Sequence, residues 1–350
     1  YPNGSASAEI KRGASTINLS AGSEYSFQQE EGTDTLTDVI NGGLIESRRK
    51  FNVYEEFNPY VAASWALERA ADKSMRLNSR WSPGRFDLEQ RNRVTPFGGA
   101  PHDDSLFQDY DNPVFEVGGD VTRPLAGGAI KLVGLATRRT RNNFDEYLAR
   151  DDTIPQGPHV VGGFEQTQKA KRNETIGRLT WTRQDFGGFS VEAGGEAVLN
   201  TLDSTVDLRV IEPDGSRTRI DLPIDSAKVK EKRGEIFVRA GRSLGPALRV
   251  DAGLTFEYSH LTVTGDALAD RKLKFLKPSA TVDWKPGRGW HTQFSVKRTV
   301  AQLDFYDFIS VAELSTDRVN GGNANLQPQR AWEFRFTGDH KILGDGLVKL

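Results

Sequence analysis

The sequence predicts an all-β protein, an antiparallel transmembrane β-barrel of the outer-membrane type. Three features of the 350-residue chain support this fold class. Long segments alternate strictly between apolar and polar residues, their connections alternate between short turns and long polar stretches, and aromatic residues gather near the ends of the alternating segments. Together these features are typical of a barrel whose outer face meets lipid.

The alternation is clearest in residues 248–258. Leu248, Leu254 and Phe256 stand on one face, and Arg249 and Glu257 stand on the other. Period two is the pattern of a strand with one apolar and one wet face, and about ten tilted residues cross a bilayer. Strands of soluble sheets are usually about five or six residues long. The same long alternation recurs in residues 17–28, 189–200, 276–285, 290–297 and 332–337.

The connections come in two sizes. Short ones contain glycine, with or without proline, which favour tight turns, at 124–128, 185–188, 243–246, 286–289 and 343–346, and residues 68–73 form a slightly longer member of the series. Long polar ones, predicted to be extracellular loops, cover 28–47, 95–112, 141–167, 202–227, 260–271 and 301–330. Outer-membrane barrels alternate short periplasmic turns with longer extracellular loops. This scheme gives about thirteen strands, and it predicts that residues 1–350 form one partial barrel domain, truncated at both ends.

The apolar positions change parity in one place. Met75, Leu77 and Trp81 occupy odd positions, whereas Phe86 and Leu88 occupy even ones. Residues 82–85 form either a β-bulge that flips the register or a turn that shifts the parity upstream. We favour the bulge, because residues 68–73 already supply a turn.

Aromatic residues flank two of the short turns. Trp284 and Trp290 stand on either side of one turn, and Phe186 and Phe189 on either side of another. Such rings form the interfacial girdles of membrane barrels. The alternative is that they pack in a soluble core, but they lie on the same face as the apolar stripe.

Composition excludes several classes of protein. The net charge is −2 and there is no cysteine, so nucleic-acid binding, thiolate metal sites and disulfides are not predicted. Mean hydropathy is −0.54, and no run of about eighteen apolar residues marks a transmembrane helix. No signal peptide is visible at the N-terminus.

Candidate chemistry is sparse. The five histidines are scattered without metal-ligand spacing, at His102, His159, His260, His291 and His340. Acidic clusters at 30–34, 103–104 and 109–111 offer oxygen ligands for calcium, but solvated loops are the favoured interpretation. Basic runs at 48–50, 138–141 and 228–233 either pair with lipopolysaccharide phosphates or are generic charge beyond the bilayer, two hypotheses of equal weight.

Charged residues on the polar face are expected to line a hydrated lumen. The inward carboxylates are balanced by inward cations, at Glu192, Glu196, Asp251 and Glu257 and at Arg178, Arg249, Lys297 and Arg335. No nucleophile with an orienting base is recognisable, so the chain is not predicted to be an enzyme. No catalytic, cofactor-binding or metal-binding residue is assigned, no cofactor is expected, and the sequence leaves the ligand-binding residues unknown.

Two segments resemble a known family. Residues 320–330, which include Gly322, Asn323, Leu326 and Pro328 and lead into a strand, resemble the loop-to-strand signature of TonB-dependent outer-membrane receptors. Gln329 stands where the family usually has glutamate. Residues 275–286 resemble the hairpin that precedes this signature in the same family, with leucine, proline and tryptophan at matching spacing.

The resemblance implies part of a 22-stranded barrel in the cell outer membrane. It also implies TonB-energised uptake of a scarce ligand, such as a siderophore, cobalamin, glycan or peptide. Expected partners are outer-membrane lipid and lipopolysaccharide, the small-molecule or oligomeric ligand, and the TonB complex through a plug domain not in this chain; nucleic acid is not expected. Two alternatives stay open: another large barrel, porin-like or in lipopolysaccharide assembly, and a soluble all-β carbohydrate-binding or adhesive protein with a dry core.

Overall fold

The computed structural model describes residues 2–151, 160–287, 289–314, 318–342 and 346–349. Its main element is one antiparallel sheet of 15 strands. The strands are β1 (Gly4–Arg12), β2 (Ser15–Thr37), β3 (Leu44–Ala70), β4 (Lys73–Pro96), β5 (His102–Leu125), β6 (Gly128–Arg150), β7 (Val160–Phe186), β8 (Phe189–Ile211), β9 (Arg217–Ile220), β10 (Ser226–Ser243), β11 (Leu248–Gly265), β12 (Ala269–Gly287), β13 (Trp290–Val300), β16 (Arg330–Ile342) and β17 (Gly346–Lys349). A 3-10 helix, η1 (Phe305–Phe308), and a two-stranded sheet of β14 (Val311–Glu313) and β15 (Arg318–Asn320) lie between β13 and β16.

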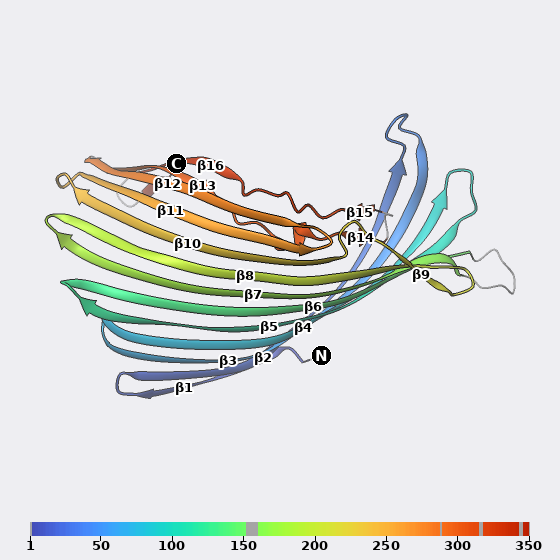
Figure 1. Cartoon of the computed structure of the whole chain (residues 1–350), viewed down its shortest axis with the longest axis horizontal. Helices are drawn as coiled ribbons and strands as arrows, with labels where there is room; N and C mark the ends of the chain where they lie inside the picture. The colour runs from blue at the N-terminus through green and yellow to red at the C-terminus, as the bar shows by residue number, and fades with distance from the viewer. Residues whose placement is uncertain (1, 152–159, 288, 315–317, 343–345, 350) are drawn as a thin grey trace.

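Strands adjacent in the sheet are also adjacent in sequence, apart from β9, which pairs only with β8 in the described chain, and the inserted β14 and β15. Figure 1 shows a curved sheet with the short turns gathered at one end and longer hairpins, such as β2–β3 and β4–β5, extending at the other. The sheet is open, because no described pairing joins β1 to β17. This is the arrangement expected for part of an antiparallel barrel. No helical segment in the described ranges is long and apolar enough to cross a membrane.

The short turns form where the sequence predicts them. Between β5 and β6, Ala126 and Gly127 have φ values of 52° and 73°. Gly187 and Gly188, between β7 and β8, have φ values of 64° and 81°. Two consecutive positive φ angles are the geometry of the tight hairpin turn that matches the twist of a sheet. The turns at 68–73 and 243–246 and the described part of 286–289 are also confirmed, while residues 343–345 lie outside the described residues.

Apart from residues 301–330, the long polar stretches are mostly strand rather than loop. β3 and β7 each have 27 residues, and β2 extends to Thr37. The prediction of long loops at 28–47, 95–112 and 141–167 is therefore wrong for most of those residues. Cross-strand hydrogen bonds and ion pairs stabilise polar strands beyond the apolar region. The polarity of these segments therefore did not distinguish a strand from a loop.

The change of parity near residue 82 is not a bulge. β4 is continuous, and its pairing with β3 keeps one register from Phe57↔Arg85 to Val61↔Trp81. Phe86 instead points to the inner face, where its ring centroid lies 6.3 Å from that of Tyr54 and 5.4 Å from that of Tyr110. Neither of the two alternatives taken from the sequence is correct, because the apolar side of the strand itself changes face.

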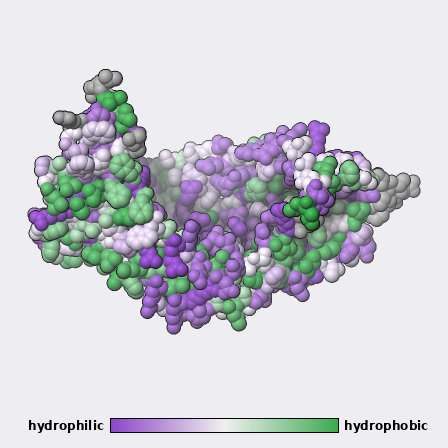
Figure 2. All heavy atoms as spheres, turned by 90° about the horizontal axis from the view of Figure 1, so that it is seen from above, coloured by the Kyte–Doolittle hydropathy of each residue, from purple (hydrophilic) through white to green (hydrophobic). Residues whose placement is uncertain are grey.

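The same change divides the whole sheet into two regions. In the turn half, the part of each strand next to the short turns, apolar side chains point outward: Ile236 is 66% exposed and Phe334 69%. In the loop half, the remainder of each strand, apolar side chains point inward and are buried, with Leu202 and Leu261 each 1% exposed. In Figure 2 the short-turn end, at the left, carries broad hydrophobic areas, and hydrophilic residues cover the lower middle of the molecule.

The outward apolar belt decides against the soluble alternative. That alternative requires the apolar stripes to face one another in a dry core. Instead, Ile236, Phe256 and Leu276 lie side by side in register on the outer face and are 66%, 41% and 49% exposed. A contiguous belt of this kind on tilted strands is the lipid-facing surface of a membrane barrel.

Candidate ligand-binding site

The segment that joins β13 to β16, residues 301–329, folds onto the inner face of the loop half; we call it the strap, described here except for 315–317. Asp304 caps η1 by accepting a hydrogen bond from the Tyr306 backbone N–H at 3.0 Å. Phe305 and Phe308 then point into the sheet and are 2% and 0% exposed. They pack in a cluster with apolar residues of the loop half, among them Leu202, Val229, Leu261 and Val263. The inward apolar positions of the strands are therefore explained by the strap.

Two buried polar side chains fix the strap in place. The Gln166 side chain, on β7, accepts the Ala312 N–H at 2.9 Å and donates to the Ala312 carbonyl at 3.2 Å, in the manner of a neighbouring strand. Ser310 accepts the Ile224 N–H at 3.0 Å, and its own N–H donates to the Ile224 carbonyl at 3.0 Å. Buried polar groups need such partners, so these contacts determine where the strap can lie.

A cavity of about 530 Å³ lies between the strap and the inner face of β5, β6 and β7. It lies beyond the apolar belt, in the loop half. Polar side chains that converge from all three strands and from the strap line much of it. They are Gln108, Tyr110, Asn112, Arg141, Asn143, Asp145, Gln166, Gln168, Tyr306 and Glu313.

A hydrogen-bonded cluster forms one wall of this cavity. The Tyr110 hydroxyl and the Gln108 amide both donate to Asp145 Oδ1, each at 2.6 Å. Burial raises the pKa of Asp145, although these hydrogen bonds act in the opposite direction. Burial, together with the nearby Asp145 carboxylate, also raises the pKa of the Tyr110 hydroxyl. The three side chains therefore form one hydrogen-bonded wall, and burial shifts its carboxyl group toward the protonated form.

Next to this cluster on β6, the cavity presents a cation and an unpaired acceptor. The Arg141 guanidinium lies 4.3 Å from the centroid of the Tyr306 ring, which couples the strap to β6. Asn143 Oδ1 is buried and has no hydrogen-bond partner in the described residues. A guanidinium forks onto anionic groups, so Arg141 offers a contact for a negatively charged group of a ligand, in a cavity that Asp145 and Glu313 also line.

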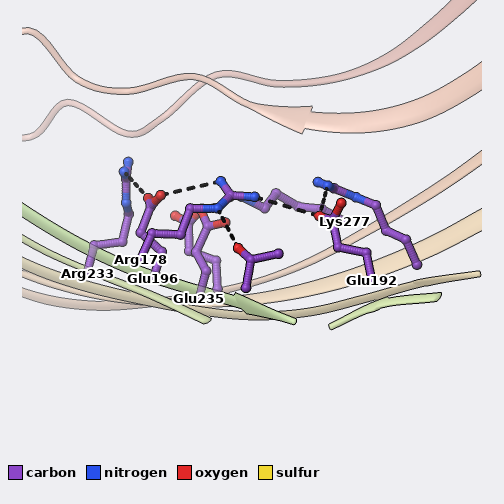
Figure 3. Close-up of polar contacts among 9 residues, drawn as sticks. Arg178, Glu192, Glu196, Arg233, Glu235 and Lys277 are labelled. Carbon is purple, nitrogen blue, oxygen red and sulfur yellow. Dashed lines mark hydrogen bonds and ion pairs between the residues drawn. The ribbon is translucent and has the colours of Figure 1, made fainter. Parts of the chain in front are cut away.

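Below the cavity, the lumen wall of the turn half carries a ladder of ion pairs (Figure 3). Arg178 lies 3.6 Å from Glu196 and 3.9 Å from Glu192. Arg233 contacts Glu196 at 3.4 Å, and Arg239 contacts Glu192 at 2.7 Å. These side chains come from β7, β8 and β10 and lie on the same face of the sheet.

Lys277 continues the ladder on β12. Its ammonium lies 2.7 Å from both Glu235 and Glu257. The eight side chains of the ladder thus comprise four cations and four carboxylates, and their charges cancel. The inward direction predicted for Glu192, Glu196, Glu257 and Arg178 is confirmed.

The other charged clusters of the sequence are not brought together as sites. In the acidic clusters, Glu31 lies 3.5 Å from Arg49, Asp103 lies 2.8 Å from Arg93, and Asp34 pairs with Lys50. His291 lies between Asp283 and Asp339, at 2.8 and 3.1 Å, and His159 falls outside the described residues. Among the described residues, no group of three or more His, Asp or Glu side chains has the arrangement of a metal site.

Sequence reasoning missed the cavity residues because it placed them in loops. Tyr110, Arg141, Asp145 and Gln166 fall in or at the edge of stretches predicted to be extracellular loops. The signal that identifies them is strand parity continued past the belt: even positions in β5 and β7 and odd positions in β6 point inward.

Comparison with known proteins tests the fold. No family model matches the sequence, and no curated protein matches it significantly. Among solved structures, the siderophore receptor PiuA from Acinetobacter baumannii aligns with a TM-score of 0.53 at 13% identity, over 98% of this chain and 55% of that chain. The ferric-catecholate import receptor Fiu from K12 E. coli aligns with a TM-score of 0.52 at 12% identity, over 99% of this chain and 56% of that one.

The fold is that of a TonB-dependent receptor barrel. This confirms the fold class that the alternation predicts. The chain spans about half the length of the two receptors. The residues that carry the family resemblance lie as expected: 275–286 fall in β12 up to its turn, and 320–330 lead into β16.

Proposed function

We propose that this chain is the barrel portion of an outer-membrane receptor for TonB-energised uptake of a scarce small molecule. The observation that carries the proposal is the cavity between the strap and the loop half. It is polar, it lies beyond the lipid belt, and it is closed on one side by the strap, which packs on the inner face of the sheet. A ligand captured from outside meets this cavity before it meets the lumen.

The ligand class we propose is a ferric siderophore or a similar anionic iron chelate. Arg141, the Tyr306 ring and the Asn143 acceptor offer charge, a flat apolar face and hydrogen bonding within one cavity. The two similar receptors are named for a siderophore and for ferric catecholates. Cobalamin, a glycan or a peptide would gain less binding energy from the charge of Arg141 than an anionic chelate would.

We also propose that a plug domain, not in this chain, binds against the lumen ladder. The TonB complex would apply its force to this domain. The ladder suits this role because its charges cancel within the wall. A neutral, hydrogen-bonding surface can release a domain at small electrostatic cost, whereas an uncompensated charged wall would hold it. No catalysis is assigned to the chain.

The first experiment is fractionation of the full-length gene product from a Gram-negative cell, with heat-modifiable migration on a detergent gel. We expect recovery in the outer membrane and a migration shift on heating. Soluble recovery without a shift would contradict the proposal.

The second experiment measures uptake of radioactive iron as a ferric-catecholate complex into cells that carry the receptor or its Arg141→Ala variant. We expect the variant to take up at least about tenfold less at low ligand concentration. Arg139→Ala is the matched control, because Arg139 lies on the same strand and face but pairs with Glu116 at 3.8 Å outside the cavity. Equal loss in both variants, or uptake that does not depend on TonB, would favour a passive barrel instead.

A further inference from the structure

The basic run at 228–233 is divided between the two faces of β10. Arg233 points inward to the ladder, whereas Lys228, Lys230 and Lys232 point outward and are exposed. Lys228 pairs with Asp203 at 3.2 Å. The environment of the other two, Lys230 and Lys232, is set by the residues beside them on β11 and β12.

Register places two more lysines beside them. Lys232 pairs with His260 of β11, and His260 pairs with Lys272 of β12, so the three lie in one row across the sheet. Lys274 lies in the next row, opposite Tyr258. Side chains opposite one another on adjacent strands have Cβ atoms about 4.5–5.5 Å apart. Lys230, Lys232, Lys272 and Lys274 therefore form one outward patch, which we call the lysine patch.

The lysine patch has no internal compensation. In the described parts of the chain, none of its four ammonium groups has a carboxylate within ion-pair distance. Two nearby carboxylates have other partners: Asp270 pairs with His260 at 2.8 Å and Asp203 with Lys228 at 3.2 Å. The four cations of the lumen ladder, by contrast, all have carboxylate partners. Each of the four lysines stands opposite His260, Tyr258 or Thr262 of β11, so their ammonium groups surround that strand and are free to bind an anion.

The position of the patch identifies the anion. Directly below it, toward the short turns, lie Tyr258 and then the apolar row of Ile236, Phe256 and Leu276, which are 66%, 41% and 49% exposed. A tyrosine at the end of an apolar belt marks the headgroup level. Lysine side chains at this level extend their ammonium groups into the headgroup region, where lipid phosphates are the available anions.

We propose that the lysine patch on β10, β11 and β12 is a binding site for the phosphate groups of an outer-leaflet phosphoglycolipid, the chemistry of lipopolysaccharide. The acyl chains lie on the apolar belt, and the phosphates bind the four ammonium groups. The proposal rests on the outer-membrane position of the barrel but not on its ligand or its energy source.

The test is binding of purified bis-phosphorylated lipid A to the full-length protein in detergent, measured by native mass spectrometry. Lys232→Gln/Lys272→Gln/Lys274→Gln is expected to bind about a hundredfold more weakly. The same three positions changed to arginine should retain binding, which separates lost charge from lost folding. Lipid A without its phosphates should bind the unchanged protein as weakly as the intact lipid binds the glutamine variant.

The matched control is Arg49→Gln/Arg91→Gln/Arg93→Gln. It removes the same charge from the outer face of the loop half, at cations that pair with Glu31, Glu89 and Asp103. We expect its lipid binding to be unchanged. Equal binding by the lysine variant, equal loss in the control, or equal binding of the phosphate-free lipid would each overturn the proposal. Failure of outer-membrane fractionation would instead overturn the proposed function, so the two failures are distinguishable.

Discussion

The turn half and the loop half are built from the same strands but carry opposite polarity. On β11, Leu254 is outward and 44% exposed, whereas Leu261, seven residues further along, is inward and 1% exposed. Between them, Glu257 faces the lumen and Tyr258 faces the headgroup level. Along the strand, the surroundings of the outer face change from lipid to water, and those of the inner face change from the hydrated lumen to the packed strap. The polarity of the side chains on each face changes accordingly. An apolar stripe thus belongs to an environment rather than to a face of the strand.

Deleting a leucine on each half of β11 gives the largest expected difference. Leu261→Ala leaves a cavity in the packed cluster and should lower the free energy of unfolding by about 2–5 kcal/mol. Leu254→Ala should cost about 1 kcal/mol or less, because lipid chains fill the space that the side chain leaves. Urea unfolding in lipid vesicles measures both. Equal losses would mean that the strap does not form a packed core.

Adding a charge on each face of β12 is the next largest effect. Ala280→Lys places an ammonium on the lipid face and should cost about 2–4 kcal/mol. Thr281→Lys, the adjacent residue, places the same charge in the lumen opposite Asp251 and should cost less than about 1 kcal/mol. The measurement is again the free energy of unfolding in vesicles. A larger cost for the lumen variant would reverse our assignment of the two faces.

Gln166→Ala sharpens the comparison within the loop half. It leaves the N–H and carbonyl of Ala312 without their partner, which should cost about 1–3 kcal/mol. The strap should then open more often, and chymotrypsin should cleave after Phe308, which is 0% exposed when the strap is in place. Gln168→Ala is the control, two residues away on the same strand and face. Similar cleavage of both variants would show that Gln166 does not hold the strap.

The smallest effect is a dependence on pH. Because burial raises the pKa of Asp145, the folded protein keeps this proton at pH values above about 3.9, where an aspartate in the unfolded chain has lost it. The folded state then binds more protons, so the stability from this group falls as pH rises through the interval up to the raised pKa. Asp145→Asn should remove that slope from unfolding measured across the interval. An unchanged slope would show that Asp145 ionises normally.

The turn half was predictable from the sequence, and the loop half was not. In the turn half, lipid on one side and lumen on the other impose a strict alternation, and the turns carry glycine where φ is positive, as at Gly127 and Gly187. In the loop half, Leu106 and Gln108 point inward together on β5, so the alternation of hydropathy is lost although the strand continues. The role of Gln166 depends on its hydrogen bond with Ala312, which is 146 residues away. A pattern in the local sequence does not predict such a contact. The same limit hid the cavity residues. The sequence did show the basic run at 228–233, but only the register across three strands places Lys272 and Lys274 beside it.

The contact between Gln166 and Ala312 also allows the opening of the strap to be measured by hydrogen exchange. The Ala312 N–H is bonded at 2.9 Å to a side chain that only a seated strap can reach. Its proton can exchange with deuterated water only when the strap lifts. The exchange rate of this single amide therefore measures how often the strap opens, and the measurement needs neither a label nor a bound ligand. A ligand that holds the strap closed would slow that exchange at one backbone position, whatever its chemical identity.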